Sequence, residues 1–200
     1  MSVHTRQQAP EADRSGRSME FPDGTVYVIT EPAEASGGER FQMDVVLVPD
    51  GDTPPPHVHP HQHEHYEVME GTFEVQIGGA WRTLTAGQTA EVKPGERHRF
   101  RNTSGAVTRV RTTFRPALSF EVYIERVHRA ITTGKLKGPG DPKSLLYLSM
   151  LFHEHRDTVR GAAAPQRIAM TVANWLGRLL RLQLPPEQAA RNDTAPAKRR

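Results

Sequence analysis

The chain has 200 residues, of which 36% are hydrophobic and 24% are charged, so it can form one ordinary domain with a core and is not a disordered chain. Cysteine is absent, which excludes disulfides, thiolate metal sites and a cysteine nucleophile, and leaves ten histidines and the carboxylates as metal-binding side chains. The formal net charge is +3 and the last ten residues carry all of it, so no basic face for nucleic acid is implied.

The two ends of the chain differ from its middle. Residues 1–18 are polar, lack the apolar run of a signal peptide and predict a disordered N-terminal arm, and residues 185–200 predict a disordered basic tail. The longest uncharged apolar runs are too short to cross a bilayer, which needs about 20 residues. We therefore expect a cytoplasmic protein with neither a membrane nor a nucleic-acid partner.

Short runs rich in β-branched and aromatic residues follow one another from residue 25 to about residue 115, separated by turn signals. Gly78 and Gly79 stand between two alternating runs, as a two-residue hairpin connection requires. Strands at this spacing predict a mainly β fold, a small antiparallel β-barrel or jelly roll over residues 19–116. The expected strands cover residues 25–30, 41–48, 64–70, 72–77, 81–85, 89–93, 98–101 and 107–114.

Residues 117–184 change to a helical period and predict a helical extension of about three short α-helices. The first has Ser119 as its expected cap and Gly134 as its stop, the second opens at Asp141 and Pro142, and the third runs from Pro165 to about residue 181. Such short helices are not stable alone, so we expect them to pack on the barrel or on the partner subunit of a homodimer. The apolar side of the third helix consists of Ile168, Val172, Trp175, Leu176 and Leu179.

Five histidines alternate with other residues between positions 57 and 65, namely His57, His59, His61, His63 and His65. On an uninterrupted strand all five rings would face one way, which is more than one metal ion needs. Pro60 argues against an uninterrupted strand, because it cannot donate to the ladder. We therefore expect a bend over residues 60–63 that resets the alternation, so that Glu64 points the same way as His57 and His59.

His98 is the natural fourth ligand. It follows a tight turn at Pro94 and Gly95 and lies between two arginines, where a ring buried only to fill a core would need a polar partner. Three nitrogens and one oxygen suit one divalent transition metal per chain, with Fe(II) favoured and Mn, Ni, Cu or Zn as alternatives.

Two stretches of the chain resemble the two sequence motifs of the cupin superfamily. The first motif is matched in every element, by Gly51, His57, His59, Glu64 and Gly71. The second is matched by Gly87, Gly95, His98 and Asn102, with Lys93 where the family has proline. The resemblance covers about residues 25–115 and implies a six- to eight-stranded β-barrel whose single metal is held by three His and one Glu. Carried over by position, the ligands are His57, His59, Glu64 and His98.

The remaining histidines and the apolar residues near the motifs have separate expected roles. His61, His63 and His65 are expected on the surface or next to the ligands. Apolar residues facing the metal would form the wall of a small-molecule pocket, although core packing explains them equally well. The expected pocket residues are Tyr66, Val68, Phe73, Phe100 and Phe114.

Three functions remain open. The favoured hypothesis is an oxygenase that brings a small, partly apolar, enolate- or catechol-like substrate and dioxygen together at Fe(II), with Glu64 as ligand and proton acceptor. The second is a redox-neutral cyclase, isomerase or lyase, in which the metal polarises a carbonyl and His61 or His63 moves a proton. The third is a binding module that holds a small ligand without converting it, since one fold carries many functions.

Overall fold

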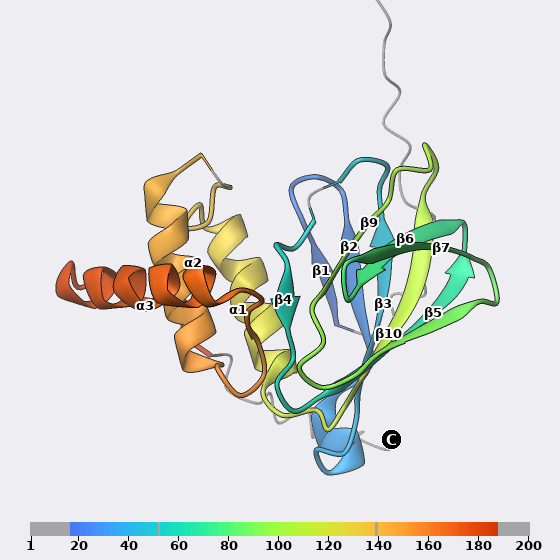
Figure 1. Cartoon of the computed structure of the whole chain (residues 1–200), viewed down its shortest axis with the longest axis horizontal. Helices are drawn as coiled ribbons and strands as arrows, with labels where there is room; N and C mark the ends of the chain where they lie inside the picture. The colour runs from blue at the N-terminus through green and yellow to red at the C-terminus, as the bar shows by residue number, and fades with distance from the viewer. Residues whose placement is uncertain (1–16, 52, 139, 188–200) are drawn as a thin grey trace, which may run out of the picture.

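The computed structural model describes residues 17–51, 53–138 and 140–187. The strands form one body, and three helices lie together against one side of it (Figure 1). Most of the expected N-terminal arm and of the expected basic tail lie outside the described residues. The first described strand, β1 (Ser18–Glu20), begins at the last residue of the expected arm.

The strands form two antiparallel sheets, so the β part is a jelly roll of two facing sheets rather than a continuous closed barrel. The first sheet has the spatial order β1, β2 (Val26–Glu31), β3 (Phe41–Leu47), β10 (Thr108–Arg115), β5 (His63–Glu70) and β8 (Thr89–Val92). The second has the order β11 (Arg160–Gly161), β4 (His57–Val58), β9 (His98–Arg101), β6 (Thr72–Ile77) and β7 (Ala80–Thr85). A short 3-10 helix, η1 (Ala33–Ser36), lies between β2 and β3.

The turn chemistry of the sequence explains the hairpins. Gly78 and Gly79 connect β6 to β7 and both have positive φ, at 59° and 98°, which glycine adopts without steric cost. Gly71 ends β5 at φ 82°, and a Cβ there would lie 2.7 Å from the Val107 carbonyl oxygen, so this position also needs glycine. The two-residue strands β4 and β11 are too short to show a sequence period, and β11 was not expected.

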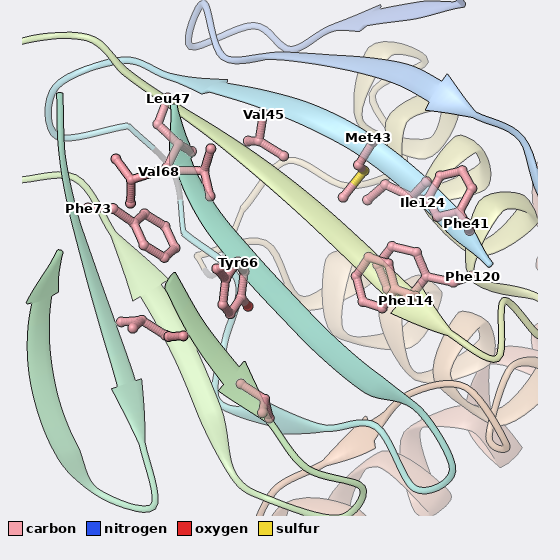
Figure 2. Packing of buried hydrophobic residues seen from close by; sticks show 14 of the residues in the cluster. Phe41, Met43, Val45, Leu47, Tyr66, Val68, Phe73, Phe114, Phe120 and Ile124 are labelled. Atoms are coloured by element: carbon pink, nitrogen blue, oxygen red, sulfur yellow. The ribbon is translucent and has the colours of Figure 1, made fainter. Parts of the chain in front are cut away.

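The main core lies between the two sheets and extends to the first helix (Figure 2). Alternate residues of β3, β5, β6 and β10 point into it, and Phe120 and Ile124 of α1 join the same cluster. The Phe114 and Phe120 rings stack with centroids 3.7 Å apart, which fixes the start of α1 against β10.

The helical extension contains the three expected helices: α1 (Phe120–Thr132), α2 (Pro142–Glu154) and α3 (Ala164–Leu179). Asp141 caps α2 by accepting a hydrogen bond from the Lys143 backbone N–H. Ser119 occupies the N-cap position of α1 but its hydroxyl does not cap the helix, because it bonds to the α2–α3 connection instead. Within the described ranges, no helix is long and apolar enough to span a membrane.

Helix α3 packs with the face opposite to its apolar side. Its buried residues are Met170, Ala173, Asn174 and Gly177. Gly177 lets α3 approach α2 closely, since a Cβ there would lie 2.7 Å from Met150 Sδ. The expected apolar side faces solvent, with Ile168 67%, Trp175 62% and Leu179 63% exposed. This side therefore does not pack on the jelly roll, which leaves the partner subunit as its expected contact.

The exposed apolar side of α3 predicts a homodimer. Its five residues, 168, 172, 175, 176 and 179, together with Leu180 directly after the helix, expose roughly 600 Å², which approaches the 800 Å² that each partner buries in a standard interface. A Trp175→Glu, Leu179→Glu variant should weaken the dimer on the order of 100-fold in sedimentation equilibrium, because two charges would enter an apolar contact. Met69→Glu, at a 39% exposed methionine of β5, is the matched control and should leave association unchanged. A wild-type monomer of 22.4 kDa at high concentration contradicts this prediction.

Candidate metal centre

The four predicted ligands come from both sheets. His57 lies in β4 and pairs directly with His98 in β9, while His59 follows β4 by one residue. The chain then bends at Pro60 and His61 and enters β5, where Glu64 lies on the inner side. The bend carries the chain from one sheet to the other, and it thereby turns an even-numbered residue toward the odd-numbered histidines.

The structure brings these four side chains together in the interior. One ring nitrogen of each of His57, His59 and His98 lies within 4.8 Å of the others. The Glu64 Oε2 atom lies 2.8 Å from His98 Nε2 and 3.4 Å from His59 Nε2. All four residues are buried, and His59 and His98 are each 1% exposed.

Backbone carbonyls fix which ring nitrogen of each histidine faces the centre. The Nδ1 atoms of His57, His59 and His98 lie 2.9, 2.7 and 3.0 Å from the carbonyl oxygens of Pro55, Thr158 and Glu96. A carbonyl oxygen only accepts, so each Nδ1 carries the proton and donates. The Nε2 atoms are then free to bind a metal through their lone pairs, as in metal sites whose ligands are oriented by outer contacts.

The centre fits a cation. His59 Nε2, His98 Nε2 and Glu64 Oε2 are buried and face one another, and among the described residues none of these atoms has a hydrogen-bond partner outside the cluster. Lone pairs of nitrogen and oxygen that face one another in a dry interior repel, and a positive charge among them removes that cost. Three imidazoles and one carboxylate are the donor set of a mononuclear transition-metal site.

The pKa values of the predicted ligands also indicate that a positive charge stabilises the cluster. Burial alone would raise the pKa of the Glu64 carboxyl, but His98 and His59 beside it bring that pKa below its usual value, so it is ionised. Burial lowers the pKa of His57 well below its usual value, and this ring stays neutral. Burial also opposes protonation of His98, but the adjacent Glu64 charge outweighs it and raises the pKa of His98. A proton on His98 is thus the cation with which a metal competes.

Aromatic side chains border the centre. The rings of Phe114 and Phe120 lie 5.3 and 5.5 Å from the His59 ring, both edge to face. Tyr66 follows Glu64 by two residues on the same side of β5, and its hydroxyl is buried beside the Glu64 carboxylate. Burial and the Glu64 charge raise the pKa of Tyr66 well above its usual value. The centre is therefore bordered by an apolar wall at His59 and by a protonated phenol at Glu64.

The predicted pocket residues do not all reach the centre. Phe114 contacts His59, and Tyr66 lies beside Glu64, whereas Val68 lies four residues beyond Glu64 along β5. Phe73 packs on Tyr66 in the core (Figure 2) and also on the partly exposed Phe100, and neither phenylalanine has a ring contact with a ligand histidine. A pocket of about 370 Å³ lies at the surface, lined by Ser36, Glu39, Arg40 and Arg115, none of which is a predicted pocket residue.

The structure does not bring His61, His63 or His65 to the ligands. All three are exposed, since His61 lies at the bend and the odd-numbered residues of β5 face outward. His63 Nδ1 lies 2.8 Å from Glu91 Oε1 on the neighbouring strand, which is a surface contact. The proton transfer expected of His61 and His63 therefore has no support from their position.

Sequence reasoning missed two groups at the centre. Phe120 is not among the expected pocket residues, although its ring stands against His59. The Thr158 carbonyl, which orients His59, is a backbone atom 99 residues further along the chain, and no side-chain pattern could indicate it.

The convergence of the four ligands predicts one transition-metal ion per chain. Single substitutions His57→Ala, His59→Ala, Glu64→Ala and His98→Ala should each lower metal affinity by about 10-fold or more, because each removes one donor from a closed set. Metal analysis of the purified protein and competition with a chelator measure both quantities. Full occupancy in a His57→Ala, His98→Ala variant would disprove the assignment.

The outward histidines give a matched set of controls. His61→Ala, His63→Ala and His65→Ala should retain wild-type metal content at pH 7.5, since their rings are exposed, while His59→Ala should lose it. Bound metal is measured by elemental analysis after gel filtration. A loss in His61→Ala or His63→Ala equal to that in His59→Ala would place the bend, and the ligand set, elsewhere.

Comparison with known proteins agrees with the two motifs. The family model of the cupin domain matches residues 43–114. A search of curated proteins found no significant match. Residues 43–114 run from β3 to β10 and contain all four ligands.

Many solved structures are similar to the chain. An oxalate oxidase in complex with glycolate is 27% identical with a TM-score of 0.41, over 48% of this chain and 53%, about half, of that one. A predicted oxalate decarboxylase from Thermotoga maritima is 17% identical over 52% of this chain and 94% of that one, with a TM-score of 0.46. An RmlC-like cupin from Shewanella frigidimarina is 20% identical over 60% of this chain and 97% of that one, with a TM-score of 0.46.

The family match and the two motifs fall on the same part of the jelly roll, around the four predicted ligands. Residues 43–114, about a third of the chain, are therefore a cupin domain.

Proposed function

We propose that this protein is a metal-dependent oxygenase that acts on a small, partly apolar molecule at a mononuclear centre held by His57, His59, Glu64 and His98. One observation carries the proposal: three imidazole nitrogens and one carboxylate oxygen converge in the interior, and backbone contacts leave their metal-binding atoms free. Fe(II) is the favoured metal, because nitrogen and carboxylate donors suit it and it supports redox chemistry.

When bound, such a metal supplies Lewis acidity and the redox chemistry that joins an electron-rich substrate to dioxygen. The protein sets the conditions for it. Neutral imidazoles and a single carboxylate leave a divalent ion with positive charge that is not fully compensated. Phe114 and Phe120 cover His59 and keep water from that side, where electrostatic interactions are consequently stronger.

Two side chains at the centre exchange or hold protons. Glu64 is ionised and is the proton acceptor nearest the ligands. Tyr66 stays protonated at neutral pH because its pKa is raised, so its hydroxyl can donate a hydrogen bond to a bound substrate but cannot act as a base. The burial of this hydroxyl beside the Glu64 carboxylate supports a role in substrate orientation.

A redox-neutral cyclase, isomerase or lyase is the alternative, and the position of the histidines disfavours it. In this alternative His61 or His63 would move the proton, and both rings are exposed and lie away from the ligands. A binding module that holds a ligand without turnover would use the same metal and the same apolar wall. These functions differ in their requirement for dioxygen and in the presence of turnover.

The Fe(II)-loaded protein, incubated with a panel of enolate- and catechol-type substrates, should consume dioxygen in proportion to product. Removal of dioxygen should stop product formation, because dioxygen is a reactant. His57→Ala should lower the rate by about 100-fold or more, whereas the exposed His65→Ala should not. An oxygen electrode and mass spectrometry of the products measure these effects.

Product formation without dioxygen would replace the oxygenase with the redox-neutral alternative. Substrate binding without turnover under any condition would favour the binding module.

A further inference from the structure

The connection between α2 and α3 reaches the metal centre from outside the cupin domain. The Thr158 carbonyl oxygen accepts a 2.7 Å hydrogen bond from His59 Nδ1. Two residues later β11 pairs with β4, with Gly161 opposite His57 and Arg160 opposite Val58. The segments that carry two of the four ligands therefore rest on residues about a hundred positions further along the chain.

Thr158 is held in place by a small buried hydrogen-bond network. The backbone N–H groups of Thr158 and Val159 both donate to the His155 carbonyl oxygen, at 2.8 and 2.9 Å, which closes a tight turn after α2. The Ser119 hydroxyl lies 2.8 Å from Thr158 Oγ1 and 2.9 Å from His155 Nδ1, and the Ser119 N–H also donates to Thr158 Oγ1. Thr158 and Val159 are each 1% exposed, so water cannot replace these contacts.

The network continues from His155 to the last described residues. Arg126 Nη1 lies 3.4 Å from His155 Nε2, and Arg126 Nε donates to the Pro185 carbonyl oxygen at 3.0 Å. Burial and the adjacent Arg126 lower the pKa of His155, so its ring is neutral and carries one proton. Arg126 faces Nε2, which places that proton on Nδ1 and directs it to Ser119. The donors thus run in one direction, from α1 through His155 and Ser119 to Thr158.

The orientation of His59 depends on Thr158, the last residue of this hydrogen-bond network. His59 is 1% exposed, and its Nδ1–H has no other acceptor among the hydrogen bonds of the described residues. If the Thr158 carbonyl moved, a buried N–H would lose its partner and the ring would lose the orientation that presents Nε2 to the metal. Phe120, the residue after Ser119, packs on the same ring, so Ser119 links both supports of His59.

We infer that the helical extension is a structural part of the metal centre: Ser119 and Thr158 are positioning residues for His59, and metal binding is coupled to docking of the α2–α3 connection on the cupin domain. The inference rests on the metal site of the proposed function but not on its oxygenase chemistry. Coupling between the two equilibria is reciprocal. If docking of the α2–α3 connection raises the metal affinity by a given factor, metal binding favours docking by the same factor.

The test uses the full-length protein and Zn(II), which binds such donor sets without redox change. Ser119→Ala removes the link between the two supports, and Thr158→Val removes the hydroxyl contacts but keeps the carbonyl and the shape. Both should bind Zn(II) about 10- to 100-fold more weakly in chelator competition. Ser119→Thr, which keeps the hydroxyl, should restore most of the affinity.

Two buried or partly buried hydroxyls serve as matched controls. Ser149 bonds only within α2, to the Leu145 carbonyl, and Thr113 accepts from Gln42 Nε2 on β3. Ser149→Ala and Thr113→Val should therefore keep the Zn(II) affinity within about 2-fold of wild type, since neither hydroxyl is bonded to a ligand or to a residue that orients one.

Two further measurements separate positioning from general stability. In the Co(II)-substituted protein, Ser119→Ala should change the visible absorption spectrum, because the ligand geometry changes, while Ser149→Ala should not. In wild-type protein, Zn(II) should slow hydrogen exchange of the amides of residues 158–161, as coupling requires. This second measurement needs no variant and stands even if Thr158→Val fails to fold.

Wild-type Zn(II) affinity in a folded Ser119→Ala variant, or exchange of residues 158–161 that Zn(II) does not change, overturns the inference. A wild-type protein that binds no metal at all overturns the metal centre itself. A protein that binds Zn(II) as expected but consumes no dioxygen with Fe(II) overturns only the oxygenase proposal.

Discussion

Three imidazole lone pairs and a carboxylate face one another in the interior of the jelly roll, and the rest of the structure accommodates this unfavourable arrangement. A buried polar group without a partner costs about 1–3 kcal/mol, so the cluster is tolerated only if a cation completes it. The fold cannot relax it by rotating the rings, because each Nδ1 is bound to a backbone carbonyl. The cation that stabilises the cluster is therefore a proton on His98 or a metal ion.

The carbonyls that impose this arrangement come from three separate places. Pro55 and Glu96 lie two residues before the histidines they orient, so the local turn supplies the contact. Thr158 is the exception, since it belongs to the extension. Two ligands are therefore oriented by the strand ends of the cupin domain itself, and His59 only by a segment that follows it. His59, the ligand that Phe114 and Phe120 contact, is consequently the one whose ring orientation depends on the helical extension.

The features that the sequence predicted correctly are those that depend on interactions between neighbouring residues. The Gly78-Gly79 hairpin, the Asp141 cap and the alternation of β5 each depend on a few neighbouring residues, and each could be read from the chain. The Pro60 bend was visible for the same reason. Contacts between distant segments were not: β11 has two residues and no period, and the hydroxyl of Ser119 prefers a partner 36 or 39 residues away to its own helix. For α3 the sequence identified the apolar side correctly but not the direction it faces, because Gly177 and Ala173 make the opposite side the closer fit to α2.

β4 is short, and the helical extension supplies contacts that this strand lacks within the cupin domain. β4 has two residues, and its only paired residue with β9 is His57 with His98. A strand held by one pair at a sheet edge has little to resist fraying, and here that strand carries one ligand and leads to another. Pairing with β11 on its other side adds two residue pairs to that one and covers the edge, and Gln166 at the start of α3 adds a hydrogen bond to the Pro56 carbonyl oxygen. Because those contacts come from the connection that also supplies Thr158, one docking event both protects the strand and orients its second histidine. The extension thus stabilises β4 and orients His59, as longer neighbouring strands would otherwise do.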